Sequence, residues 1–140
     1  MFDIESADAE GVLRTVKKVL RAVFTTMITV REVPPPFGIH YYADKKAEAF
    51  IVEQPSDPDS IRRALNKNAR RQGLIGSVYV SRGEHKNEAC FVASVNLPGR
   101  GVTMVLPVKN GKGKGISSEE PYIVEDVELP GNLEYEGLAN

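Results

Sequence analysis

Three side chains in this sequence could act as nucleophile or base, and they lie far apart along the chain. Cys90 is the only cysteine, and His40 and His85 are the only histidines. A catalytic pair would require Cys90 within hydrogen-bond reach of one histidine. Cys90 falls in a predicted strand, opposite in pleat to Phe91, which is typical of a small buried hydrophobic residue. The pattern therefore assigns no catalytic residue, and this wide spacing predicts no metal site.

The glycine- and lysine-rich segment Gly111–Gly115 has the composition of a phosphate-binding loop without its pattern. A P-loop needs the spacing G-x-x-x-x-G-K-[ST] and a helix directly after it. Here Lys114 is followed by Gly115, and residues 117–121 form a poor helix sequence. We interpret the segment as a flexible linker. The alternative is a basic loop in which Lys112 and Lys114 contact phosphate non-specifically.

A second group of cations lies on a predicted helix over residues 57–72. Asp57, Pro58 and Asp59 form a helix start signal, and Gly73 favours a C-terminal stop. The helix carries five cations: Arg62, Arg63, Lys67, Arg70 and Arg71. They could contact phosphates along a nucleic acid, or simply form a solvated face. No aromatic residue interleaves with them, so base stacking from this helix is not expected.

The formal charge is strongly polarised along the chain. Residues 60–116 carry eleven Lys/Arg and two acids, or +9, whereas residues 117–140 carry seven acids and no Lys or Arg, or −7. A basic block of this kind can face a polyanion, and an acidic tail can cover it. The predicted partners are therefore a nucleic acid or an acidic protein surface. Exchange of the tail between two copies would make a homodimer.

An aromatic cluster at Phe37–Tyr42 offers an alternative site. These side chains could line a small-molecule pocket between helix and sheet, or form part of the core and its rim. The protein would then be a small-molecule binder or a small enzyme. A third alternative is an inhibitory or structural protein that works through an exposed sheet edge.

The elements that must position these residues follow from hydrophobic periodicity. Apolar residues at spacings of three and four predict a first helix over residues 7–29, with Ser6 or Asp8 as its cap. Strands are predicted at Glu48–Gln54, Ile75–Arg82, Ala89–Leu97 and Val102–Lys109, with an earlier one at Gly38–Tyr42. A polar loop over Arg82–Asn87 and a tight turn at Pro98-Gly99 are expected to connect the last three strands. The spacing predicts a common core of ten residues: Leu13, Val16, Leu20, Val23, Ile61, Leu65, Phe91, Val95, Met104 and Leu106. The predicted fold is α+β: two helices on one face of a small, mostly antiparallel sheet of about four to six strands, in the order α-β-α-β-β-β.

Length and composition complete the interpretation. A chain of 140 residues predicts one α+β domain, placed at 1–116, with an acidic tail over 117–140 that could add an edge strand. No apolar run approaches the ~20 residues of a membrane span, and the acidic start does not match a signal peptide. We therefore expect a cytoplasmic, non-catalytic binding protein without a cofactor. Its expected contact surface is the basic helix together with the Gly/Lys loop.

Overall fold

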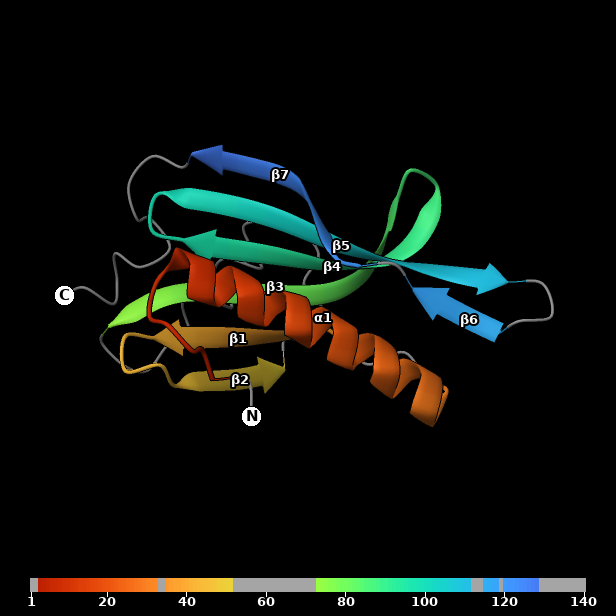
Figure 1. Ribbon diagram of the computed structural model, residues 1–140, viewed down its shortest axis with the longest axis horizontal. Coiled ribbons are helices and arrows are strands. Elements are labelled where there is room, and N and C mark those ends of the chain that lie inside the picture. Colours follow the sequence, from red (N-terminus) through yellow and green to blue (C-terminus); the bar gives the residue numbers. More distant parts are fainter. Residues whose placement is uncertain (1–2, 33–34, 52–72, 112–114, 119, 129–140) are drawn as a thin grey trace.

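A computed structural model describes residues 3–32, 35–51, 73–111, 115–118 and 120–128. Within these ranges the fold is α+β, with one helix packed on an antiparallel sheet (Figure 1). The elements are α1 (Ala9–Val30), β1 (Phe37–Tyr42), β2 (Ala47–Ile51), β3 (Leu74–His85), β4 (Glu88–Leu97), β5 (Arg100–Gly111), β6 (Gly115–Ser118) and β7 (Tyr122–Glu128). The predicted class is confirmed in this form. The second predicted helix, at 57–72, lies outside the described residues.

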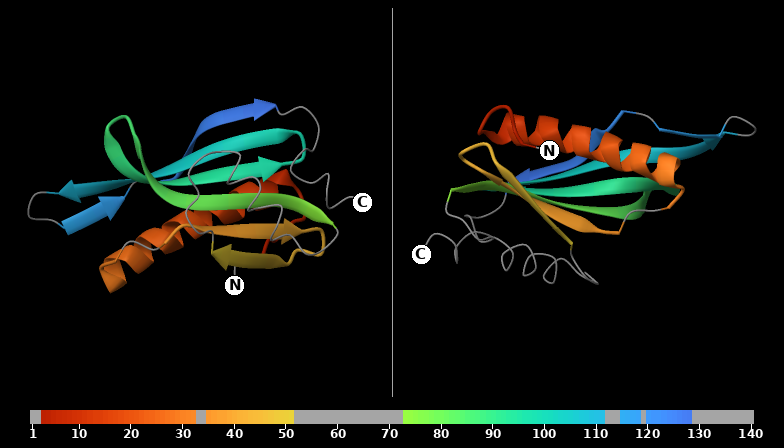
Figure 2. Two further views of the ribbon diagram at one scale, coloured as in Figure 1. Left: turned by 180° about the vertical axis from the view of Figure 1, so that it is seen from behind. Right: turned by 90° about the horizontal axis from the view of Figure 1, so that it is seen from below.

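The strands form one layer and α1 lies across one side of it (Figure 2). The main sheet has the order β2-β1-β3-β4-β5-β7, and all of its pairs are antiparallel. β5 is long enough to pair twice: residues 100–105 pair with β7, and residues 108–111 pair with β6. Among the described strands, β2 and β7 are therefore the two edges of the main sheet.

The first helix starts at a side-chain cap. Asp8 is extended, with φ −146° and ψ 174°, and its carboxylate accepts a hydrogen bond from the Gly11 amide at 2.7 Å. This bond satisfies one of the amide groups that a helix start leaves without an intrahelical partner. The same bond, with a further one from the Ser6 hydroxyl, lowers the pKa of Asp8. The helix ends at Arg31, which adopts the left-handed conformation at φ 62°.

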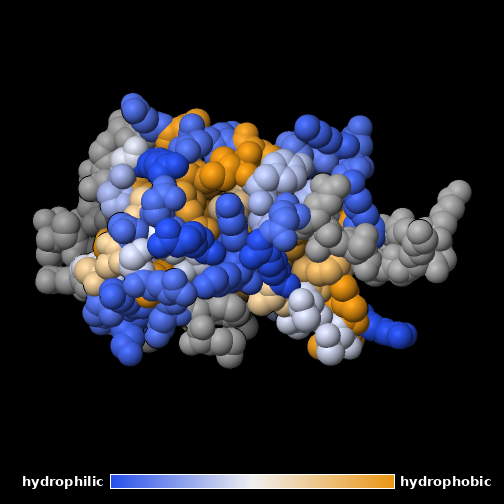
Figure 3. Space-filling model, viewed as in Figure 1, coloured by the Kyte–Doolittle hydropathy of each residue, from blue (hydrophilic) through white to orange (hydrophobic). Residues whose placement is uncertain are grey.

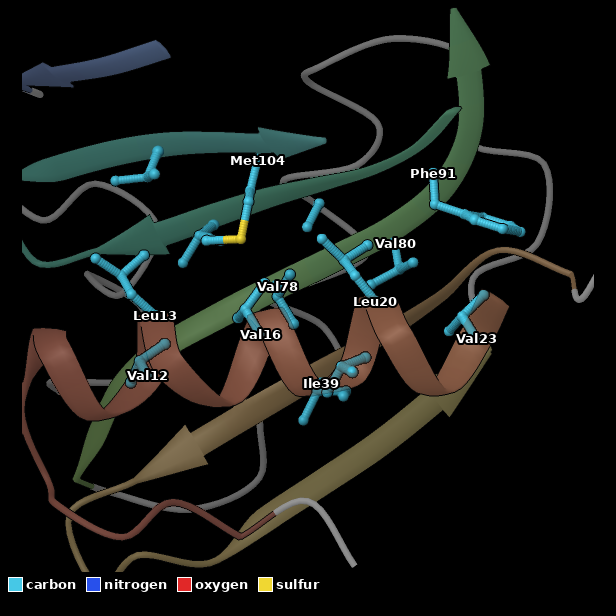
Figure 4. Close-up of a cluster of buried hydrophobic side chains, with 14 of the residues drawn as sticks. Val12, Leu13, Val16, Leu20, Val23, Ile39, Val78, Val80, Phe91 and Met104 are labelled. Atoms are coloured by element: carbon cyan, nitrogen blue, oxygen red, sulfur yellow. The ribbon is translucent and has the colours of Figure 1, made fainter. Parts of the chain in front are cut away.

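The core lies between α1 and the strands β3, β4 and β5 (Figure 4). Eight residues that the spacing predicted to be buried together are confirmed there: Leu13, Val16, Leu20, Val23, Phe91, Val95, Met104 and Leu106. The other two, Ile61 and Leu65, lie outside the described residues. Alternation along each strand brings every second side chain to this layer.

Close contact between helix and sheet depends on a glycine. A Cβ atom at Gly76 would lie 3.0 Å from a methyl carbon of Leu97 and 3.4 Å from those of Val12. Val12 is fully buried at this point. A larger residue at position 76 would therefore push the first turns of α1 away from β3 and β4.

Two hairpins connect the central strands. Leu97 pairs with Arg100, and Gly99 has φ 72°, which confirms the predicted turn at Pro98-Gly99. The prediction of a polar loop over Arg82–Asn87 is wrong. The strand continues to His85, and Lys86 and Asn87 both have positive φ, at 51° and 64°, as a two-residue primed turn requires. The sequence pattern did not indicate this extension, because the strand projects beyond the core there and its residues are charged or polar instead of alternating with apolar ones.

The interpretation of Gly111–Gly115 as a flexible linker is corrected at the two ends of the segment. Lys109 pairs with Ser117, and Gly111 pairs with Gly115, so both ends of the segment belong to a hairpin. Glycine weakens a strand without forbidding it, and here the backbone pairing of β5 continues through the glycines. Lys112 and Lys114 lie outside the described residues.

The packing of α1 gives a direct test of the core. Leu20 is fully buried between helix and sheet. We expect Leu20→Ala to lower the free energy of unfolding by about 2–5 kcal/mol, since it removes apolar contacts and leaves a cavity. Urea denaturation measures this change.

A matched variant on the exposed side of the same helix serves as the control. Thr26 is exposed, and its hydroxyl donates only to the Ala22 carbonyl of its own helix. Thr26→Ala should change stability by less than about 0.5 kcal/mol. Equal effects of Leu20→Ala and Thr26→Ala would contradict the assigned core.

Candidate functional site

The sheet face opposite α1 carries polar side chains aligned across the strands. In the pairing register, Glu48 of β2 faces His40 of β1, His40 faces Ser77 of β3, and Ser77 faces Asn96 of β4. Directly opposed residues of neighbouring strands have their side chains on the same face and within reach of each other. These four residues therefore form one cross-strand row on this face, which we call the polar row.

The centre of the polar row is a buried hydrogen-bonded pair. Nδ1 of His40 lies 2.7 Å from Oγ of Ser77, and these residues are 0% and 1% exposed. The imidazole also stacks on the ring of Phe50, with centroids 4.7 Å apart. This stacking is possible because β2 runs beside β1 at Gly38, which leaves room for the Phe50 ring. Ser77 and Phe50 are thus two of the neighbours that hold the imidazole in place.

The order of groups in the row is that of an acid–base–nucleophile relay, with Glu48, His40 and Ser77 on three adjacent strands. Such a relay works only when the nucleophile oxygen can reach a substrate carbon and when donors stabilise the developing oxyanion. The hydroxyl of Ser77 is sealed by its surroundings, as its residue exposure of 1% shows. The pair therefore acts in this structure as a buried polar contact that fixes β1 against β3.

Cys90 is buried, as its strand position predicted. Burial raises the pKa of its thiol; the charge of Arg82 lowers it, and Glu84 raises it further. A thiol of this kind is a poor nucleophile at neutral pH, because the thiolate is the reactive form. Among the described residues, no group of three His, Cys, Asp or Glu side chains is placed to hold a metal ion.

The predicted cationic site cannot be placed in the fold. All seven of its residues lie outside the described part of the chain: Arg62, Arg63, Lys67, Arg70, Arg71, Lys112 and Lys114. Two other cations of the basic block have internal contacts. Arg82 lies over the Phe91 ring, 5.6 Å from its centroid, and its guanidinium is 3.7 Å from the Met27 sulfur. The Arg82 side chain thus packs against two residues of the core, Phe91 and Met27.

Arg100 also contributes to structure, through the acidic segment. Its Nε and Nη2 donate to the two carboxylate oxygens of Asp126 at 2.8 Å and 2.6 Å. This bidentate contact raises the pKa of Arg100 and lowers that of Asp126. A second acid of the segment, Glu120, forms an ion pair with Arg21 of α1. The strand β7 is therefore attached at both ends by charge contacts with the same chain.

One of the two outermost described strands of the main sheet, β7, carries exposed apolar side chains. Tyr122, Ile123 and Val127 are 37%, 41% and 41% exposed, and among the described strands β7 pairs with β5 alone. Ile123 faces the same side as Met104, which packs under α1, whereas Val127 lies opposite Gly101 on the other face. Figure 3 shows hydrophobic atoms among hydrophilic ones over β5 and β7.

The aromatic cluster at Phe37–Tyr42 does not share one face of the sheet. Ile39 and Tyr41 belong to the core beneath α1, and Phe37 packs against that core. His40 and Tyr42 lie outside this cluster and their rings are neighbours, with centroids 6.3 Å apart. Successive side chains of a strand point to opposite faces of the sheet, so neighbouring residues of β1 lie on different faces. The segment is therefore divided between two faces and does not line one common surface.

Sequence reasoning missed the contact between His40 and Ser77. Both residues fell in predicted strands, but the pairing of β1 with β3 joins residues separated by about 37 positions. No local signal specifies such a long-range register. The exposed edge had a signal, because Tyr122-Ile123-Val124 stands between acids as a short apolar run.

Comparison with known protein families, with curated proteins and with solved structures gave no match. The function must therefore be argued from the described geometry. Among the helices in the described part of the chain, none is long and apolar enough to cross a membrane.

Two buried hydroxyl groups provide a matched test of the polar row. Ser77→Ala removes the partner of His40 Nδ1, so we expect it to lower the free energy of unfolding by about 1–3 kcal/mol. The Tyr41 hydroxyl is buried without a hydrogen-bond partner among the described residues. Tyr41→Phe should therefore be neutral or stabilising, as measured by thermal and urea unfolding. A destabilisation by Tyr41→Phe as large as that by Ser77→Ala would contradict this account.

Proposed function

We propose that this chain is a non-catalytic binding protein that contacts another macromolecule through the β7 edge of its sheet. The observation that carries the proposal is the exposure of Tyr122, Ile123 and Val127 on a strand whose outer side is unpaired among the described strands. A free strand edge presents a row of backbone donors and acceptors to a second chain. Exposed apolar side chains on the same strand add area that a partner can bury.

The chemistry of the polar groups supports a binding role over a catalytic one. His40 and Ser77 are sealed from solvent, and the thiol of Cys90 is buried and its pKa raised. The small-molecule or enzyme alternative near Phe37–Tyr42 gains no comparable support, because the segment is divided between the two faces of the sheet.

The basic surface remains a second part of this proposal, supported by the charge of the sequence. Residues 60–116 carry a formal +9, and a nucleic acid or an acidic protein surface fits that charge. Arg82 and Arg100 have internal contacts, so this interpretation rests on the cations of the predicted helix and of the Gly/Lys loop: Arg62, Arg63, Lys67, Arg70, Arg71, Lys112 and Lys114. A cytoplasmic location and tail exchange into a homodimer likewise remain predictions.

Position-specific photo-crosslinking tests the β7 edge in the full chain. A photoreactive amino acid replaces Val127 or Tyr122 on β7, or the exposed residue Thr26 on α1 as the control. If the edge is the contact surface, a discrete adduct should form from the two β7 positions and not from the control. Digestion of the adduct by protease or nuclease identifies the class of partner.

A second variant makes this crosslinking result specific. Ile123→Lys places a charge on the exposed apolar edge, and in the Val127 crosslinking background it should reduce the adduct several-fold. The pairing of β7 with β5 should persist, because the side chain at position 123 is already 41% exposed. Adducts of equal yield from Thr26 and Val127, or none from any position, would contradict the proposed contact surface.

The basic surface has its own test. Replacement of Arg63, Lys67 and Arg70 by glutamine should weaken binding to mixed DNA or RNA while leaving the melting temperature nearly unchanged. The slope of log affinity on log salt should fall by roughly 0.7–0.9 for each lost phosphate contact. If the triple variant unfolds, these residues are structural, and if it binds like the parent, the cationic surface has no role in binding.

A further inference from the structure

The acids along β7 differ in whether they are already paired. Glu120 and Asp126 form ion pairs with Arg21 and Arg100 of the same chain. Glu125 and Glu128 are exposed and have no ion-pair partner among the described residues. The outer edge of the sheet therefore combines exposed apolar side chains with two carboxylates that have no ion-pair partner in the described part of the chain, which we call the two free carboxylates.

These two free carboxylates lie on opposite faces of the strand. Glu125 pairs with Thr103, whose side of the sheet is away from α1, and Glu128 pairs with Arg100 on the helix side. Val127 lies next to Glu125 on the first face, since it is two residues further along the strand. A strand added to this edge would therefore meet one carboxylate on each face and an apolar side chain beside one of them.

A second copy of this chain is a poor occupant of the edge. Two β7 strands that pair antiparallel about a twofold axis place Glu125 against its own copy when the register centres on that residue. When the register centres on Val127, Asp126 of one strand faces Glu128 of the other. Like charges directly opposite each other destabilise a strand pair, so the acids disfavour pairing of two copies in these two registers.

A nucleic acid is also disfavoured at this edge. Three of the seven residues of β7 are acids, Glu125, Asp126 and Glu128, and a phosphate backbone would be repelled by them. An extended polypeptide can instead pair with the backbone of β7 through main-chain hydrogen bonds. Its side chains then decide the specificity, by meeting the carboxylates and the apolar residues of the edge.

We infer that the β7 edge binds an extended polypeptide strand that carries both apolar and basic residues, with a basic side chain opposite Glu125 and another beside Glu128. This inference rests on the proposed function, because it specifies the partner of the same edge. The apolar residues of the added strand cover Val127 and Tyr122, and the bidentate pair of Arg100 with Asp126 holds β7 in place while the strand binds.

Synthetic peptides of defined composition test the inference with the full-length protein. The first is a seven-residue peptide of valine, threonine and lysine; the second has glutamate in place of lysine. The third has the first sequence with alternate backbone amides N-methylated, which removes the strand donors. We expect the lysine peptide to bind about tenfold more tightly than the glutamate peptide, since two cross-strand charge pairs change sign. The N-methylated peptide should not bind.

Hydrogen exchange identifies where the peptide binds. The lysine peptide should slow amide exchange within residues 122–128 and leave the opposite edge, residues 47–51, unchanged. Higher salt should reduce its affinity, because the interacting charges are exposed. Protection at the β2 edge or across α1 would overturn the assignment to β7.

Two matched double variants distinguish the effect of the two β7 carboxylates from the effect of a change in net charge. Glu125→Gln with Glu128→Gln should reduce the preference for lysine over glutamate to about twofold or less. Glu32→Gln with Glu88→Gln removes two exposed acids elsewhere on the chain and should leave the preference unchanged. Equal loss in both double variants would show a non-specific charge effect and overturn the inference.

The outcome separates this inference from the proposed function. If position-specific crosslinking succeeds at Val127 but the lysine peptide binds no better than the glutamate peptide, the edge is a contact surface for a partner of other chemistry. If analytical centrifugation shows a dimer that Val127→Lys dissolves, a second copy is the occupant. Either result overturns the basic strand as the partner, while the failure of crosslinking alone counts against the proposed function.

Discussion

The arrangement of this fold depends on how much of a sheet one helix can cover. α1 packs on β3, β4 and β5, and the buried cluster lies beneath it. A helix is about 10–12 Å wide with its side chains, whereas neighbouring strands are about 4.8 Å apart. One helix therefore covers only part of this sheet. β7 lies beyond this width, so apolar residues on it, such as Ile123, stay exposed.

This geometry explains why charge contacts hold β7. Few of its side chains are buried, so the strand gains little from the hydrophobic core. Backbone pairing with β5 is supplemented by Arg100 with Asp126 and by Arg21 with Glu120, which connect the strand to β5 and to α1. Exposed ion pairs contribute modestly to stability. Their clearer effect is to fix the position of the edge and to leave Glu125 and Glu128 for other contacts.

The elements near the core could be predicted from the sequence, because periodicity reports burial directly. The stripe through Leu13, Val16 and Leu20 and the alternation through Phe91 and Val95 are both confirmed. The ends of β3 and β5 were missed, since their extensions leave the core and lose apolar alternation. The contact of His40 with Ser77 could not be predicted, because it depends on the register between two strands that are far apart in the sequence. The predicted cationic residues lie outside the described part of the chain.

The acids of β7 affect both the pairing of two copies of the chain and the choice of a partner strand. A free edge with exposed valine and isoleucine would normally promote pairing between copies. Placing Glu125, Asp126 and Glu128 along seven residues makes self-pairing bring like charges together in the fully overlapping register, where Glu125 meets its own copy. Among the described strands the outer side of β7 is unpaired, so an incoming strand can pair there and is selected by its charge. A surface that rejects its own copy by repulsion and accepts a basic strand by attraction therefore needs no catalytic group and no preformed cavity.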